Sequence, residues 1–463
     1  MSRFYVLWVT VICLVGLTGH AQTMSLREAV EQAILTNPKI DAAQASRRAT
    51  VYGLDQAKGR FLPEIELDAD VGQQKIDRPN GLGPESNAIW RDRRQATLSI
   101  RQVLFDGWER RYDIYRSQAN ISAAAYRVLV RSEAVGLTSV EAYIDVVRHN
   151  ELLGLAQENV RRHQSLLGII RERFDGGKSP VGDLEQTVER VESAKALVAQ
   201  IKVAQATARA KFKNAVGISP PKLKPVAYAT GIPKSVAAVT HAALQNNPRV
   251  KAAVAEADVS YFDKKQFHST LYPQVYLEGS ATRGEDLEGT PGRNDELEAR
   301  VVLRWKLFDG GVRRSHEAEL GERHSEKVTE QLILARQLTE EVEIAWGRLV
   351  EGRAEVEAIK REVVQNGKVV AAYRDEYNAN KRSLLDVLDA ENARFASEFE
   401  LSNVIALHLL SSYELLAQMG TLLSTLGINA PDMPEPVAAG PVPRLLRSTT
   451  SQDQFAIPPL SQE

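Results

Sequence analysis

The residues best suited to act on ions are two aspartates near the C-terminal end of the chain. Asp386 and Asp389 lie about one helical turn apart in the string LLDVLD at 384–389. In a ring of three chains they would form two stacked acidic rings, an arrangement that attracts cations at a pore. Asp386 also follows Ser383 at the spacing of a capping box, so a purely structural role as a helix cap is the alternative.

The sequence contains no motif that indicates an enzyme. Gly177-Lys178-Ser179 is similar to the end of a phosphate-binding loop, but Glu172 stands where that motif requires glycine, and no strand precedes it. The histidines lack a metal-ligand spacing such as His-Glu-x-x-His, and no serine lies in a nucleophile elbow. We therefore expect no catalysis, no cofactor and no metal site.

Two turns between long helices must position the candidate ionic residues. The aspartates follow a turn at 377–383, and its counterpart earlier in the chain is a turn at 174–180. In the earlier turn, Ser179 is expected to be the N-cap and Pro180 the first residue of the next helix.

The two turns belong to two copies of one structural repeat. The string LFDG at 104–107 returns at 307–310, an offset of 203 residues, whereas the Asn-Pro pair at 37–38 returns at 247–248, an offset of 210. The change of offset places a length difference of seven residues between the strands. Repeated landmarks in the same order predict two units of similar fold. We assign residues 22–230 to the first repeat and residues 231–428 to the second.

Two end segments lie outside the repeats. Arg3, an uncharged run at 4–17 and Gly19-His20-Ala21 have the order of a secretory signal peptide at 1–21, with an uncleaved anchor as the alternative. The proline-rich tail at 429–463 is expected to be disordered. The net charge of −2 argues against nucleic acid as a partner, because phosphate binding needs a basic surplus.

Each repeat is expected to contain a helical segment, two strands, a very long helix and a further helix. The ranges in the first repeat are 25–60, 64–74, 96–105, 108–173 and 180–217. Those in the second are 236–268, 274–282, 297–307, 311–377 and 383–426. The shorter helices are expected to stack end to end, 180–217 with 236–268 and 383–426 with 25–60. Each stack would then have about the length of one long helix.

The very long helices have a coiled-coil pattern. Apolar residues recur every seven positions at Val342, Leu349, Val356, Val363, Val370 and Tyr377. The same register occurs 203 residues earlier. Such a seam requires lengthwise packing against other helices. A fibrous coiled coil is an alternative explanation of the heptads alone.

The four strands alternate apolar and polar residues. Residues 64–71 read EIELDADV, and strands of about 9–11 residues suit an outer membrane, with a half-buried soluble sheet as the alternative. Four strands cannot close a barrel, and an open edge in lipid leaves backbone groups unpaired. The expected fold is mainly α with a small β part. Long antiparallel coiled-coil-like helices and four amphipathic strands per chain would trimerise into a twelve-helix α-barrel and a twelve-stranded transmembrane β-barrel.

The sequence resembles the TolC family of outer-membrane export channels over about residues 23–428. The resemblance rests on the string KRSLLDVLDAEN at 381–392 and on the duplicated Asn-Pro and Phe-Asp-Gly landmarks. It implies a homotrimer in outer-membrane lipid, with a helical tunnel through the periplasm. It also implies closure at the helical tips, where a periplasmic adaptor (membrane fusion protein) and an inner-membrane ABC or RND transporter would dock.

The resemblance also implies a function. The string at 381–392 is most similar to members that serve type I protein secretion, which implies an exit duct for an exported polypeptide. The outer-membrane component of a multidrug or small-molecule efflux pump is the alternative. A periplasmic coiled-coil adaptor and a soluble coiled-coil scaffold are further alternatives from other classes.

Site residues follow from the resemblance, position by position. Those implied at the periplasmic gate and pore mouth are Asp183, Tyr377, Arg382, Asp386 and Asp389. Those implied in adaptor docking at the helix tips are Gly177, Ser179, Pro180, Val181, Lys381 and Ser383. Our hypothesis is that Asp183 and Arg382 restrain the closed mouth.

Overall fold

The structure, a computed structural model, describes residues 23–76, 90–289 and 291–431. The predicted signal peptide and nearly all of the predicted tail lie outside these residues. The chain divides into two compact units. The described part of unit 1 comprises 23–36, 138–228 and 351–410, and that of unit 2 comprises 37–76, 90–137, 229–289, 291–350 and 411–431. Three helices, α3 (Glu109–Asp175), α7 (Val312–Asn378) and α8 (Leu384–Gln418), contribute residues to both units.

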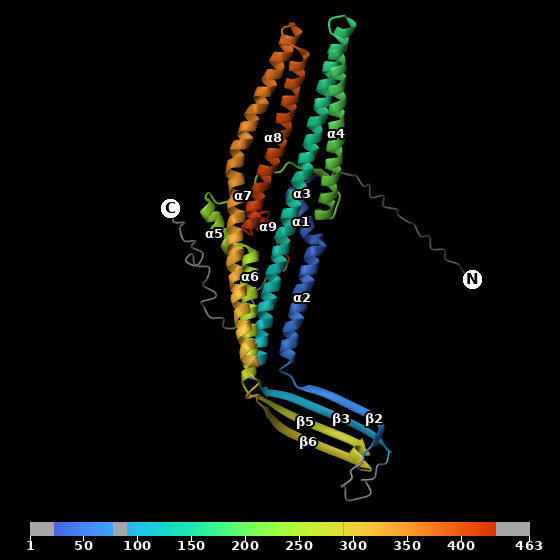
Figure 1. The fold of residues 1–463 in the computed structure, drawn as a ribbon, viewed down its shortest axis with the longest axis vertical. Coiled ribbons are helices and arrows are strands. Elements are labelled where there is room, and N and C mark those ends of the chain that lie inside the picture. The colour runs from blue at the N-terminus through green and yellow to red at the C-terminus, as the bar shows by residue number, and fades with distance from the viewer. Residues whose placement is uncertain (1–22, 77–89, 290, 432–463) are drawn as a thin grey trace, which may run out of the picture. The chain divides into compact units, whose positions relative to one another are not determined.

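The same order of parts occurs twice along the chain (Figure 1). The first set is α1 (Leu26–Thr36), α2 (Pro38–Gly59), β2 (Glu64–Lys75), β3 (Trp90–Phe105), α3 and α4 (Val181–Val216). The second is α5 (Val236–Asn246), α6 (Pro248–His268), β5 (Gln274–Glu285), β6 (Arg293–Arg304), α7 and α8 (Leu384–Gln418), followed by α9 (Leu422–Thr425). The predicted mainly helical class with four amphipathic strands is confirmed. The repeat boundaries at 22–230 and 231–428 stay a prediction.

The predicted single helices at 25–60 and 236–268 are each two helices. Asn37 caps α2, its Oδ1 accepting from Lys39 N at 3.0 Å, and Asn247 caps α6, accepting from Arg249 N at 2.8 Å. The proline that follows each asparagine has no N–H, so the preceding helix cannot continue through it. The Asn-Pro landmarks therefore mark breaks, with asparagine as N-cap and proline at the first helical position.

The predicted end-to-end stacking of the shorter helices was wrong in its pairing. In unit 2, Asn247 Nδ2 donates to Gln418 O at 2.8 Å, so α8 ends against the start of α6. Gly420 follows with φ +67, and a Cβ added there would lie 2.9 Å from Asn247 Cα. In unit 1, a Cβ on Gly217 after α4 would lie 3.2 Å from Thr36 Oγ1 at the end of α1. Thus 383–426 meets 236–268, and 180–217 meets 25–60.

A short parallel strand pair closes one end of unit 1. β1 (Thr23–Met24) pairs with β4 (Lys222–Leu223), and the buried hydroxyl of Tyr143 on α3 donates at 2.7 Å to Met24 O and at 2.8 Å to Lys224 O. One hydroxyl hydrogen is shared between two carbonyls, so Tyr143 ties both strands to the helix.

Replacing Tyr143 with phenylalanine is expected to destabilise unit 1 by about 1–2 kcal/mol, because two backbone carbonyls lose a buried partner. The measurement is the free energy of unfolding in detergent micelles. Tyr52→Phe is the matched control, since Tyr52 is 68% exposed and its variant should change stability by less than about 0.5 kcal/mol. Equal values for the two variants would contradict a tie by Tyr143.

The four long strands form one antiparallel sheet in unit 2, in the order β2-β3-β5-β6 (Figure 1). On its polar face Glu64, Arg101, Glu278 and Arg300 stand opposite one another in a row of alternating charge. Arg101 and Arg300 lie 2.9 and 3.2 Å from the Glu278 carboxylate. The other face is apolar and exposed: Ile65, Leu67, Val71, Leu297, Val301 and Leu303 are each at least 63% exposed. β2 and β6 are the edges of this sheet.

Equivalent Asp-Arg pairs lie at two crossings from strand to helix. Asp106 Oδ2 accepts from Arg110 Nε at 2.5 Å, and Asp309 Oδ2 accepts from Arg313 Nε at 2.7 Å. The arginines also donate Nη1 to backbone carbonyls of the neighbouring crossings. The aspartate of the LFDG landmark therefore forms a local ion pair with the arginine four residues later. β6 ends at Arg304, before its predicted end at residue 307, and the chain then leads to the pair of Asp309 and Arg313.

Within the described residues, no helix combines the length and the apolar character that crossing a membrane requires. The same residues place no group of three or more His, Cys, Asp or Glu side chains where they could hold a metal ion.

Candidate functional site

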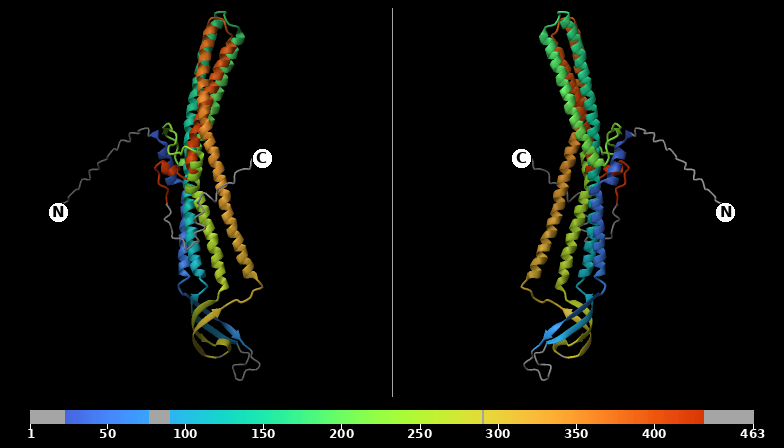
Figure 2. Two further views of the ribbon diagram at one scale, coloured as in Figure 1. Left: turned by 90° about the vertical axis from the view of Figure 1, so that its left-hand side faces the viewer. Right: turned by 90° about the vertical axis from the view of Figure 1, so that its right-hand side faces the viewer.

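The candidate mouth residues lie in unit 1, at the ends of two helical hairpins, α3 with α4 and α7 with α8 (Figure 2). The first hairpin turns at Gly177, which has φ +69, and Lys178 N donates to Arg173 O at 2.7 Å. This pattern ends α3 with a left-handed glycine. α4 then begins at Val181 with Pro180 as its N-cap residue and no side-chain cap. Ser179 is thus not the N-cap: Pro180 has ψ 158, which is extended, so the helix starts one residue later than predicted.

The second hairpin turns at Asn380, which has φ +57, and Lys381 N donates to Glu376 O at 2.8 Å. The predicted capping box is confirmed. Asp386 N donates to Ser383 Oγ at 3.2 Å, and Asp386 Oδ2 accepts from Ser383 N at 3.4 Å and from Ser383 Oγ at 2.7 Å. Asp386 therefore caps the start of α8, and its carboxylate remains 44% exposed.

Tyr377 lies in the apolar core that holds the two hairpins together near the tips. It is 7% exposed and packs with five other residues of that core: Leu166, Ile170, Leu384, Val387 and Leu388. The Arg173 guanidinium lies 4.7 Å from the centre of the Tyr377 ring, and its Nη2 donates to Asn380 Oδ1 at 2.7 Å. Arg173 on α3 thus joins the two hairpins. Its role depends on contacts across the hairpins and is not visible in the sequence spacing.

Arg382 is held within its own hairpin. Its Nε donates to Glu376 Oε2 at 2.6 Å, its guanidinium lies 3.8 Å from the centre of the Tyr373 ring, and its Nη1 lies 3.7 Å from Asp386 Oδ2. Asp183 lies in the first turn of α4, where its carbonyl accepts from Thr187 Oγ1 at 2.7 Å. The described part of the chain contains no ion pair between Asp183 and Arg382. The hydrogen-bond partner of Arg382 is Glu376, which no sequence motif indicated.

Asp389 faces a base from the other hairpin. Its carboxylate is 61% exposed, and Oδ1 lies 3.7 Å from Arg190 Nη2 on α4. Asp386 and Asp389 are thus exposed acids, each with an arginine 3.7 Å away. The candidate docking residues Gly177, Pro180, Val181, Lys381 and Ser383 are exposed at the two turns, and Ser179 is half-buried.

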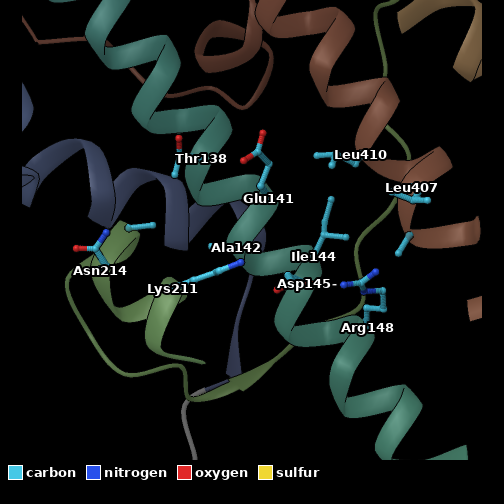
Figure 3. Close-up of a pocket in the computed structure, with 12 residues that line it drawn as sticks. Thr138, Glu141, Ala142, Ile144, Asp145, Arg148, Lys211, Asn214, Leu407 and Leu410 are labelled. Carbon is cyan, nitrogen blue, oxygen red and sulfur yellow. Dashed lines mark hydrogen bonds and ion pairs between the residues drawn. The ribbon is translucent and has the colours of Figure 1, made fainter. Parts of the chain in front are cut away.

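A cavity of about 370 Å³ lies between α3, α4 and α8, away from the hairpin turns (Figure 3). Its charged lining residues are two acids and two bases: Glu141, Asp145, Arg148 and Lys211. Asp145 Oδ1 already pairs with Arg148 Nη2 at 2.6 Å. A lining without a net charge gives the cavity no preference for an ionic ligand.

Comparison with known proteins identifies the group to which the chain is related. The family model described as "Outer membrane efflux protein" matches residues 29–218 and 239–421. The chain is 23% identical to the outer membrane efflux protein BepC of Brucella suis, covering 88% of each chain. It is 24% identical to the outer membrane protein TolC of Escherichia coli, covering 89% of this chain and 85% of that one. It is 22% identical to the alkaline protease secretion protein AprF of Pseudomonas aeruginosa, covering 85% and 84%.

Solved structures share the fold. The outer membrane protein VceC of Vibrio cholerae matches with a TM-score of 0.71 at 16% identity, covering 87% of this chain and 96% of that one. The outer-membrane channel OprN matches with a TM-score of 0.75 at 18% identity, covering 86% and 90%. Family and fold are those of transport channels, and the predicted resemblance is confirmed. The chain belongs to the outer membrane efflux protein family, and its place is the outer membrane.

Proposed function

We propose that the protein is the outer-membrane exit duct of a tripartite export machine. It is a passive conduit that carries type I secretion cargo across the periplasm and the outer membrane. Three copies form the duct, its helices lie in the periplasm, and a periplasmic adaptor and an inner-membrane ABC or RND transporter dock on the hairpin turns. The energy comes from that transporter.

The observation that carries this proposal is the sheet of unit 2. Its apolar face is exposed, with Leu297 86% and Val71 79% exposed, whereas its polar face carries a row of alternating charges. One face suits lipid and the other suits water. The edges β2 and β6 would be unpaired in lipid, at a cost of several kcal/mol for each backbone group. Pairing β6 of one chain with β2 of the next removes both edges, and three chains supply twelve strands.

The duct is tested by gel migration and by conductance. The purified protein should migrate as an oligomer when unheated and as a monomer after heating, and it should insert into planar bilayers as a channel with discrete conductance steps. Recovery of the protein in the soluble periplasmic fraction, or the absence of any conductance, would overturn the proposal.

The class of cargo is tested by complementation. AprF is named for protease secretion, whereas BepC is named for efflux, so both classes occur among the relatives. In a strain without its own channel, we expect the protein to restore release of a type I secretion substrate when adaptor and transporter are supplied. Restored tolerance to a growth-inhibiting drug without secretion would favour the efflux alternative.

The gate hypothesis gives the expected behaviour of Arg382→Ser. Arg382 pairs with Glu376 inside its own chain, and the proposed link to Asp183 would act in addition to that pair. An ion pair at the surface contributes up to about 1 kcal/mol, which corresponds to about a fivefold change in the ratio of open to closed channels. Arg382→Ser should therefore raise single-channel conductance or open probability in planar bilayers.

The matched control is Lys381→Ser, which removes one positive charge from the same turn. Lys381 is exposed, and no ion pair with it occurs in the described residues. A rise in both variants would indicate a general charge effect, and no rise in Arg382→Ser would count against the gate.

A further inference from the structure

A buried polar layer lies next to the apolar core of the hairpin tips in unit 1. His163 on α3 and Glu391 on α8 are each only 1% exposed. Arg374 on α7 lies with Nη2 2.5 Å from Glu391 Oε1, and Arg190 on α4 extends its Nη2 toward Asp389 at 3.7 Å. Each of the four helices therefore contributes one ionisable side chain to the layer.

The polar groups of this layer are poorly matched to one another. The contact between Arg374 and Glu391 is ionic, without the alignment of a hydrogen bond. Four kinds of buried polar group in the layer have no hydrogen-bond partner among the described residues: His163 Nδ1, Arg190 Nε, Arg374 Nε and the Glu391 carboxylate oxygens. A partly matched buried network is costly compared with an apolar core. The two hairpins are thus weakly joined at this level, next to the well-packed apolar core.

The layer is placed between the hairpins. His163 belongs to the α3–α4 hairpin, whereas Glu391 and Arg374 belong to the α7–α8 hairpin. On either side, other links cross the same boundary: Arg162 Nη1 lies 2.9 Å from Glu398 Oε2, and Arg173 Nη2 donates to Asn380. A change of charge inside the layer therefore acts on the packing of one hairpin against the other.

We propose that His163 is a proton-sensitive positioning residue of the pore mouth. In its neutral form it keeps the two hairpins packed, and its protonation separates them and moves Asp389, which sits beside Arg190, away from the closed arrangement. The inference rests on the proposed function, since it assigns a control to the mouth of that channel.

The direction of the effect follows from the surroundings of His163. Burial is the largest influence and lowers the pKa of its imidazole below the usual value of about 6.5. Glu391 on α8 and Glu189 on α4 favour the charged form, while Arg190 on α4 and Arg374 on α7 disfavour it. The packed hairpins therefore bind the proton more weakly than separated, solvated ones. Packing is at full strength above about pH 6.5 and is lost as the pH falls below it.

Planar-bilayer recordings of the full-length protein test whether protonation of His163 controls the opening of the channel. Between pH 7.5 and 5.5 the open probability of the wild type should rise by about fivefold or more, the factor for about 1 kcal/mol. His163→Gln cannot take up the proton in this range, so its open probability should stay flat. His408→Gln is the matched control: His408 is also buried in unit 1 but pairs with Tyr228 at 2.9 Å outside the layer, so this variant should keep the response. Asp386 and Asp389 are present in all three proteins, so any effect of these two acids is common to all of them.

Hydrogen exchange gives a second readout that does not need conduction. After correction for intrinsic exchange rates, amides at 159–167 and 387–395 should exchange about fivefold faster at pH 5.5 than at pH 7.5 in the wild type, but not in His163→Gln. A flat wild type, or a response that persists in His163→Gln, overturns the inference in either assay. Absence of any channel at pH 7.5 would instead count against the proposed function, and the exchange result would still decide the inference.

Discussion

Replacing Gly107 with alanine is expected to destabilise the protein far more than the same replacement of Gly310. The two glycines hold the same position in the repeated LFDG landmark and have nearly the same φ, +66 and +70. A left-handed alanine costs about 1–2 kcal/mol at either position. The surroundings differ: a Cβ on Gly107 would lie 2.5 Å from Ser269 O and 2.9 Å from Tyr272 Cβ, while nothing lies within 4 Å of a Cβ on Gly310.

The clash at Gly107 involves the backbone, which cannot rotate away as a side chain can. Forced overpacking of this kind adds about 1–3 kcal/mol or more to the backbone cost. Gly107→Ala should therefore lower the free energy of unfolding in detergent micelles by about 3 kcal/mol or more, and Gly310→Ala by about half of that or less. Gly310→Ala is the control within the same chain. Equal losses of stability in the two variants would show that the turn from β3 into α3 can accommodate the added methyl group despite the short distances.

The four long strands, the long helices and their order were predicted from the sequence, but not the division of 25–60 and 236–268 into two helices each or the short strands β1 and β4. Alternation of polar and apolar residues marked all four long strands, since one face of the sheet is polar and the other is apolar. The breaks at Asn37 and Asn247 could also have been read from the sequence, because an asparagine before a proline stops one helix and starts another. The stacking partner of α8 could not, because it depends on the approach of Gly420 to Asn247 in space.

Some contacts of the candidate site could likewise be predicted from the sequence, and others could not. The capping box of Ser383 and Asp386 is local, so its spacing was enough to predict it. A signal for His163 was also present: it follows Val160 of the heptad seam by three positions, where a buried residue is expected, and its repeat equivalent Asn366 is polar too. The pair of Arg190 and Asp389 depends on how two hairpins are rotated against each other, which no spacing within one helix reveals.

Glu133 is expected to make unit 2 less stable as the pH rises toward 8. This carboxyl group on α3 is largely buried, its Oε1 accepts from Leu423 N at the start of α9 at 3.4 Å, and its Oε2 has no hydrogen-bond partner among the described residues. Burial raises the pKa of Glu133 from its usual value near 4.5 to about 7, against the smaller opposing effect of the backbone N–H groups of Leu422 and Leu423. The folded protein therefore holds this proton more tightly than the unfolded chain does.

A raised folded-state pKa contributes stability that is complete below about pH 4.5 and is lost as the pH rises through about 7. The difference of about 2.5 pKa units corresponds to about 3 kcal/mol at most. Glu133→Gln stays neutral, so the stability of unit 2, followed by hydrogen exchange of its amides, should change little between pH 5 and 8.5, while the wild type loses up to this amount. Glu151→Gln, at an exposed position on the same helix, should follow the wild type.

Because acid weakens the hairpin packing around His163 but strengthens the surroundings of Glu133, segment-resolved hydrogen exchange should show opposite pH trends in the two units. The same pH trend in both units would contradict this. It would show that either His163 or Glu133 is charged in surroundings that we expect to favour its neutral form.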